Sequence, residues 1–261
     1  MKLIRLITIS GIVLFFAACR NHQSSFPIIN SQSFNEIQVT LDGSLAKRIW
    51  ADSMNQVQEQ IPLSKKLDEM IAITQTLQKT KPDSSWMFLM KSWEELRSNE
   101  AFFSSDTLAN PVFVLQKWAE LNISLLKLTG EVRFGDTLEK LLYGSPAPVL
   151  SERLLKSVIY THIFDQIFIN LIGSSSLNHY HTTGGMIKLT QETDFPVRNE
   201  MYLKCESNDV RYLDVFVRIP EWAVNPTVSH GNVKYVAHPG EYCQISRKWR
   251  NGDEFKIILK N

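Results

Sequence analysis

The sequence contains three cysteines, whose thiols can act as nucleophiles, bind metals, form disulfides or accept acyl chains. The residues before the first of them, Cys19, indicate which of these roles it has. It follows a short basic start, an apolar run from Leu6 to Phe16 and two small residues. This order is typical of a lipoprotein signal peptide, whose cysteine receives acyl chains after cleavage. We therefore expect residues 1–18 to be a signal peptide, Cys19 to be lipidated, and residues 19–36, rich in Ser, Asn and Gln, to form a tether.

Acylated Cys19 would attach the chain to the lipid bilayer of the outer or inner membrane, in the cell envelope and facing the periplasm. The apolar run is short for a transmembrane helix, which needs about 20 residues. An ordinary cleaved signal peptide and an N-terminal anchor helix are the alternatives. Without residues 1–18, the 28 basic and 27 acidic side chains become 26 and 27. A chain so close to neutrality, with no basic stripe, lacks the electrostatic footprint of a nucleic-acid-binding protein.

The other two cysteines, Cys205 and Cys243, are the only thiols that follow Cys19 in the sequence. Both lie in segments with strand-like alternation, and an oxidising compartment permits a disulfide between them. Their separation does not follow from the sequence, so a disulfide and two free thiols both remain open.

The histidines and glutamates do not form a recognisable catalytic or metal-binding pattern. His179-x-His181 comes nearest to a ligand pair, but its glycine-containing surroundings favour a solvated hairpin loop. Three further histidines have no acidic or cysteine neighbour at a spacing that would allow metal binding: His162, His230 and His238. Glutamates on helices usually face solvent, so we do not expect those of the helical half to be catalytic. They are Glu94, Glu95, Glu120, Glu131 and Glu139. We therefore predict no catalytic residue, no cofactor and no metal site.

Tryptophan side chains could stack on sugar rings, as exposed aromatic residues do in many carbohydrate sites, or could pack in a core. Those of interest are Trp86, Trp93, Trp118, Trp222 and Trp249. Packing is the expected main role, because Trp118 lies on an apolar helix face and the last two lie in strand-like segments. Trp222 and Trp249 are retained as candidate carbohydrate contacts.

Two halves of different periodicity must position these residues. In residues 37–160 apolar side chains recur at threes and fours, as along Leu115–Leu128, and Gly130 is placed to end that helix. In residues 161–261 the period becomes two, as along Leu213–Ile219, with glycine-containing turns between such runs. The predicted fold class is α+β, with a helical domain in the first range and an antiparallel β-sandwich in the second.

Six motifs occur in a fixed order along the second half of the chain. They are Leu128-Thr129-Gly130-Glu131 with Asp136, Glu139, Leu142 and Tyr143, then Arg153-Leu154-Leu155, Phe168-Ile169-Asn170-Leu171, Gln191-Glu192-Thr193-Asp194-Phe195-Pro196, Val217-Arg218-Ile219-Pro220-Glu221-Trp222-Ala223, and Gly240-Glu241-Tyr242 with Arg247-Lys248-Trp249. Together they resemble glycoside hydrolase family 127, the β-L-arabinofuranosidase family. The resemblance implies an (α/α) barrel followed by a β-sandwich, and hydrolysis of arabinofuranosides with retention.

The resemblance also implies a zinc-bound cysteine thiolate as nucleophile, held by a glutamate and further cysteines, with a second glutamate as acid and base. This sequence has no cysteine between residues 20 and 204. An ungapped match places Pro111 and Phe113 at the family's Glu-x-Cys pair, and Pro146 and Ala147 at its adjacent cysteines. No gap can create a cysteine, so the loss of the thiolate site does not depend on the alignment.

The helical half is also short, with room for about half of the helices of an (α/α) barrel. We therefore expect a reduced, non-catalytic relative of family 127, anchored by lipid, with a role in carbohydrate handling at the cell envelope. The alternatives are an active glycoside hydrolase that uses carboxylates, and a structural remnant or half of a split protein without its own ligand. Besides the bilayer, a glycan or a protein is the expected partner.

Overall fold

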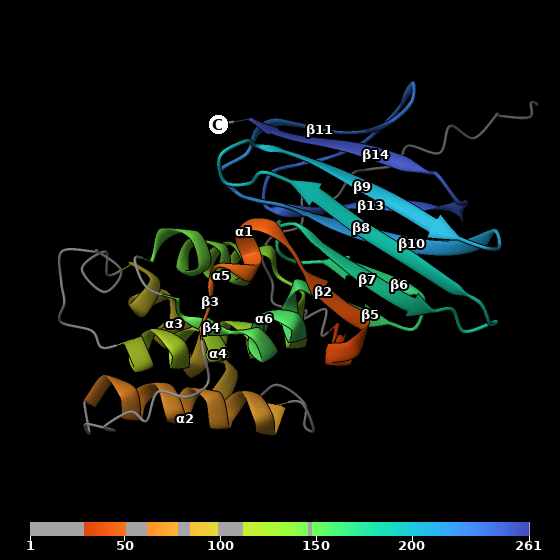
Figure 1. The fold of residues 1–261 in the computed structure, drawn as a ribbon. Helices are drawn as coiled ribbons and strands as arrows, with labels where there is room; N and C mark the ends of the chain where they lie inside the picture. Colours follow the sequence, from red (N-terminus) through yellow and green to blue (C-terminus); the bar gives the residue numbers. More distant parts are fainter. Residues whose placement is uncertain (1–28, 51–61, 78–83, 99–111, 146–147, 261) are drawn as a thin grey trace, which may run out of the picture.

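The computed structural model describes residues 29–50, 62–77, 84–98, 112–145 and 148–260, so Cys19 and the signal peptide lie outside the described residues. Figure 1 shows helices gathered on one side and β-strands on the other. The described helices are η1 (Glu36–Gln38), α1 (Gly43–Ala46), α2 (Pro62–Leu77), α3 (Ser84–Ser98), α4 (Val112–Thr129), α5 (Val132–Gly144) and α6 (Glu152–Ile159). None of them is long and apolar enough to cross a membrane.

The strands begin near residue 32 and dominate the chain after residue 160. They are β1 (Gln32–Ser33), β2 (Val39–Leu41), β3 (Ile49–Trp50), β4 (Leu150–Ser151), β5 (Tyr160–Ile163), β6 (Gln166–Ile169), β7 (Ser175–Tyr180), β8 (Met186–Thr193), β9 (Glu200–Ser207), β10 (Arg211–Ile219), β11 (Val224–His230), β12 (Val233–Tyr235), β13 (Glu241–Trp249) and β14 (Glu254–Lys260).

The helical part packs around α4, whose apolar face follows from its spacing of threes and fours. Trp118, Leu121 and Leu125 are buried on this helix, which contacts α2, α5 and α6. The helix ends at Thr129, as predicted, because Gly130 adopts φ +68°, a left-handed conformation that glycine tolerates without steric cost. The chain then turns into α5, which lies between α4 and the strands (Figure 1).

The strands form two main sheets that share one apolar core. Their orders are β1-β5-β6-β10-β13 and β12-β11-β14-β9-β8-β7-β2. Strands β6 and β10 run parallel, whereas the other described neighbours whose register is known in these two sheets run antiparallel. Along β10 the predicted alternation is observed, since Leu213, Val215, Val217 and Ile219 are buried. The prediction of an α+β fold with a shortened helical part and a β-sandwich is confirmed.

The segment before the first long helix contributes to both sheets, which was not expected from the sequence. Strand β1 pairs with β5, and β2 pairs with β7. The side chains of Phe34 and Val39 are buried. Part of the expected tether at 19–36 therefore belongs to the fold, and the expected helical domain at 37–160 opens with a strand of the sandwich. Strands of two or three residues are too short to show an alternating pattern in the sequence.

Asn170 fastens the end of α6 to the sandwich. Its backbone N–H donates to Ile159 O at 3.0 Å, and its side-chain Nδ2 donates to Val158 O at 2.8 Å. Tyr242 of β13 donates its hydroxyl to Asn170 Oδ1 at 2.6 Å. Because this buried amide holds both parts, the helices and the strands meet at a fixed junction.

Candidate functional site

A hollow of about 450 Å³ lies where α5 meets the sandwich. Its lining residues include Arg97 of α3, Asp136, Glu139 and Tyr143 of α5, Phe195 after β8, and Glu221 and Trp222 after β10. Three carboxylates and an indole ring meet here. Within the described part of the chain, this hollow is therefore the main candidate for acid–base chemistry or for a sugar contact.

Arg218 of β10 stands beside this hollow and is fully buried. Its guanidinium donates to the carboxylates of Asp136 and Glu139 and to the backbone carbonyl of Asn170. The two acids are three residues apart in α5, a spacing that places them on one helix face. A buried guanidinium needs such partners, because moving an unpaired charge out of water is very unfavourable.

The remaining carboxylate oxygens also have partners. Trp222 Nε1 donates to Glu139 Oε1 at 2.8 Å, and the backbone N–H of Glu221 donates to Asp136 Oδ2 at 3.2 Å. We call these residues, with Arg218, the interface clamp. Its acids connect α5 to the sandwich through both of their oxygens.

Burial shifts the ionisation of the clamp. It raises the pKa of Asp136 to about 6, although the nearby Arg218 opposes the shift. Burial alone would lower the pKa of Arg218, but Glu139 first and Asp136 second raise it. Both acids therefore act as counterions of the guanidinium, and the carboxyl group of Asp136 is protonated more readily than that of an exposed aspartate.

Of the two tryptophans retained as candidate sugar contacts, only Trp222 has an exposed portion. It is half-buried in the wall of the hollow and stacks on Phe195, with ring centroids 6.1 Å apart. Trp249 is fully buried; it packs on Phe255 and donates from Nε1 to Leu213 O at 3.2 Å. The prediction for Trp249 was wrong, because its inward position in β13 leaves no ring face for a sugar.

Residues 166–260 match the family model for the GH127 middle domain of β-L-arabinofuranosidase. The resemblance to family 127 is confirmed. A solved glycoside hydrolase has a TM-score of 0.64 at 15% identity, over 82% of this chain and 51% of its own. A GH127 β-arabinofuranosidase has a TM-score of 0.62 at 18% identity, over 76% of this chain and 42% of its own. This chain thus spans about half the length of these structures or less. No curated protein matches it.

The thiols differ sharply from the thiolate that family 127 chemistry implies. Cys205 lies on β9 in the seven-stranded sheet, and Cys243 lies on β13 in the five-stranded sheet. Both are free and buried, so the open question of a disulfide is answered. Burial raises the pKa of Cys205 to about 12 and that of Cys243 to about 11. Both groups are therefore protonated, poorly nucleophilic core residues near neutral pH.

The remaining helical candidates mostly serve packing or surface ion pairs. Trp86, Trp93 and Trp118 are buried, and Trp93 donates from Nε1 to the buried Asn122 at 2.9 Å. Glu94 and Glu131 pair with Arg133, and Glu95 pairs with Lys66. Glu139 is the exception: a glutamate expected to face solvent is buried, because Arg218 and Trp222 approach it from the sandwich.

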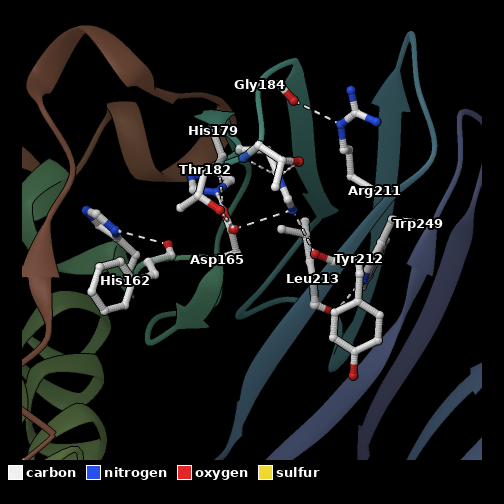
Figure 2. Close-up of polar contacts among 12 residues, drawn as sticks. His162, Asp165, His179, Thr182, Gly184, Arg211, Tyr212, Leu213 and Trp249 are labelled. Carbon is white, nitrogen blue, oxygen red and sulfur yellow. Dashed lines mark hydrogen bonds and ion pairs between the residues drawn. The ribbon is translucent and has the colours of Figure 1, made fainter.

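The histidine pair was only partly interpreted correctly. Among the described residues no group of three side chains is arranged to hold a metal ion. His181 lies in the β7–β8 turn, as expected, but His179 is a buried residue of β7. Figure 2 shows His179 facing the carboxylate of Asp165, with Nε2 at 2.9 Å from Oδ1. The solvated-loop interpretation was wrong for His179, because the strand continues to Tyr180.

The sequence did not single out Arg218 or Asp165 as site residues, although Arg218 stands in one of the six motifs. Arg218 occupies an outward position in the alternation of β10, where an arginine normally faces water. The available signal was its place directly before Ile219-Pro220-Glu221-Trp222, in a motif that resembles family 127 and lies within the residues that match the family model. Asp165 sits in a two-residue turn between β5 and β6, where aspartate is common, and carried no signal of its own.

Proposed function

We propose that this chain is a lipid-anchored, non-catalytic relative of the family 127 β-L-arabinofuranosidases that handles carbohydrate at the cell envelope. The observation that carries the non-catalytic part is the interface clamp. Asp136 and Glu139, the two buried acids of the hollow, are bound on both oxygens by Arg218, Trp222 and a backbone amide. Carboxylates in that state hold α5 against the sandwich and are poorly placed to attack an anomeric carbon.

The positions of the cysteines and acids also support the proposal of a non-catalytic protein. No cysteine lies between residues 20 and 204, and the two later thiols are buried with raised pKa values. Of the three acids lining the hollow, Glu221 has the most exposed side chain, and it forms an ion pair with Arg97 at 2.9 Å. Glycosidases that rely on carboxylates need two of them, about 5–9 Å apart, so one accessible acid is insufficient.

Trp222 supplies the contact that remains available for a glycan. Its ring is fixed from one side by Phe195 and at Nε1 by Glu139, so little side-chain entropy is lost on binding. A sugar ring could lie on the exposed part of the indole in the hollow. A single aromatic contact of this kind gives weak binding.

One observation favours the alternative of an active carboxylate glycosidase. The pKa of Asp136, raised to about 6 by burial, lies in the range that suits a general acid. If the clamp opened, Asp136 and Glu139 would both become accessible in the same hollow. A structural remnant without a ligand is the third hypothesis, which glycan binding would exclude.

The test measures hydrolysis and binding on the same mature chain. We expect no release of arabinose from aryl β-L-arabinofuranosides over a day, and weak binding of methyl β-L-arabinofuranoside by NMR. Trp222→Ala should abolish the binding that perturbs the NMR signals of the residues lining this hollow, whereas Trp222→Phe, which also loses the bond to Glu139 but keeps a ring, should retain part of it. Turnover that disappears in Glu139→Gln would refute the non-catalytic proposal. Absence of binding by the unmodified chain would favour the remnant.

The anchor is tested separately. Because serine cannot accept the acyl chains, Cys19→Ser should convert the membrane-bound form into protein that is not lipid-modified. Unchanged partition into detergent would show that another segment provides the attachment.

A further inference from the structure

The turn between β5 and β6 displays a large aromatic ring at a conformational cost. Phe164, its first residue, has φ +53° and is 78% exposed. A bulky side chain rarely adopts this left-handed conformation, and residues held in such regions cost on the order of 1–3 kcal/mol. Glycine would fit the turn more easily. A ring that gains little from burial and strains the backbone suggests a role in contact with something outside the chain.

The second turn residue, Asp165, fixes this tip to the neighbouring hairpin (Figure 2). Its carboxylate accepts hydrogen bonds from His179 Nε2 at 2.9 Å, from the Thr182 backbone N–H at 3.1 Å and from the Thr182 hydroxyl. Burial alone would raise the pKa of Asp165, but these bonds outweigh it and the pKa is lowered. The carboxylate is thus held ionised, and the tip is held in place.

Phe164 lies on the rim of a second hollow, of about 480 Å³. Aromatic rings form one part of its wall: Tyr180 is 67% exposed, and the half-buried His162 stacks on the buried Phe34 behind it, with centroids 4.4 Å apart. His162 also contributes to the fixed tip, since its Nδ1 lies 3.4 Å from the Phe164 carbonyl oxygen. The rings therefore lie at or next to the ends of β1, β5 and β7.

Amide and hydroxyl groups form the rest of the wall, with Gln32, Asn35 and Thr182 among them. No lysine, arginine, aspartate or glutamate occurs among the described residues that line this hollow. A phosphate or a carboxylate ligand would find no fixed positive charge here. A purely apolar ligand would cover the amides without satisfying their hydrogen bonds.

A neutral sugar satisfies both parts of the wall. Its C–H faces can stack on aromatic rings, and its hydroxyl groups both donate and accept, which matches side-chain amides. We propose that the hollow beside Phe164 is a glycan-binding site for a neutral saccharide. The site rests on the proposed carbohydrate role but not on Trp222, which follows the opposite end of β10.

The experiment titrates the mature chain with neutral arabino-oligosaccharides and, as the charged comparison, with oligogalacturonate. Phe164→Gly removes the ring while suiting the turn, so the fold should persist. We expect Phe164→Gly and Tyr180→Ala each to raise the Kd for the neutral probe about tenfold, the size typical of an aromatic contact residue. Val236→Ala is the control and should leave the Kd unchanged, because this exposed residue follows β12, at the edge of the seven-stranded sheet opposite to β7 and β2.

The outcomes separate this site from the Trp222 hollow. Binding that falls in Phe164→Gly and persists in Trp222→Ala supports the second site. Binding that depends on Trp222 and is unchanged in both Phe164→Gly and Tyr180→Ala overturns it and leaves the proposed function standing. Equal affinity for oligogalacturonate overturns the choice of a neutral ligand. An unmodified chain that binds neither probe overturns both glycan proposals.

Discussion

The two ends of strand β10 are associated with hollows of similar volume and opposite chemistry. After the last residue of β10, three carboxylates and two arginines are engaged with one another around Trp222. Near its first residues, the hollow beside Phe164 has a wall of rings, amides and hydroxyls without formally charged acids or bases among the described lining residues. Acids that line a hollow are therefore weak evidence for catalysis until their partners are known.

The clamp and the aromatic tip also differ in their energetics. The clamp buries three formal charges, and mutual attraction must offset the loss of hydration. The tip places an apolar ring in water, on a backbone conformation that glycine prefers. Removing one partner should therefore lower the free energy of unfolding strongly at the clamp and only slightly at the tip around Phe164.

The largest effect is expected when the clamp loses its cation. Arg218→Met leaves Asp136 and Glu139 buried without their guanidinium, which should lower the free energy of unfolding by about 3–5 kcal/mol. Arg211→Met is the matched control on the same strand. Arg211 is part-exposed and pairs with Asp209, so its loss should cost under about 1 kcal/mol.

Urea denaturation of the two variants measures this difference. Adding Asp136→Asn and Glu139→Gln to Arg218→Met should restore part of the lost stability, because no buried charge is then left without a partner. Equal losses in Arg218→Met and Arg211→Met would show that the clamp is not the main connection between α5 and the sandwich.

The next effect is a pH dependence that belongs to Asp136. Its folded pKa of about 6 exceeds the ordinary 3.8, so its contribution to stability is fully present below pH 3.8 and is lost as the pH rises through 6. Asp136→Asn stays neutral throughout. As the pH rises from 4 to 6, the free energy of unfolding of the variant should therefore increase relative to that of the unmodified chain, by on the order of 2 kcal/mol.

Denaturation of both proteins at several pH values gives this difference directly. Asp194→Asn serves as the control, since the Asp194 side chain is 70% exposed and should show no such trend. A difference between Asp136→Asn and the unmodified chain that stays flat from pH 4 to 6 would contradict the burial of this carboxyl in the folded protein.

Elements with many periodic positions could be predicted from the sequence, and contacts between distant segments could not. Helix α4 and strand β10 each present a regular apolar face, which local spacing reveals. The burial of Arg218 depends on Asp136 and Glu139, which lie 82 and 79 residues earlier in the chain. Local alternation assigned Arg218 to the solvent side, and only the packing of α5 on that side makes it a core residue.

The candidate sites show the same limit. The motif around Trp222 was recognised, but the sequence could not distinguish it from Trp249, since both lie in strand-like motifs; only the orientation of β13 buries the latter. The hollow beside Phe164 was missed altogether. Its walls come from residues near 32–38, 162–164 and 179–182, which pairing of β1 with β5 and packing of the two sheets bring together.

A smaller effect is expected from adding one methyl group beside the clamp. A Cβ at Gly135 would lie 2.6 Å from Cδ of Arg218, whose guanidinium is held by its partners. Gly135→Ala should therefore cost about 1–3 kcal/mol by overpacking. Gly144→Ala, in the same helix, meets nothing closer than 3.9 Å and should be neutral or stabilising. Thermal melting of both variants checks this, and a stabilising Gly135→Ala would mean that Arg218 can move.

The smallest effect is expected at the aromatic tip, and its sign matters more than its size. Phe164→Ala keeps a Cβ at φ +53°, whereas Phe164→Gly relieves that strain at the cost of greater freedom in the unfolded chain. Because the ring is mostly exposed, neither variant loses much burial. We expect Phe164→Gly to lie within about 1 kcal/mol of the unmodified chain and above Phe164→Ala. Urea denaturation of the three proteins at one pH decides this. If both variants were instead several kcal/mol less stable than the unmodified chain, the ring would contribute packing, and its exposure could no longer be attributed to a ligand.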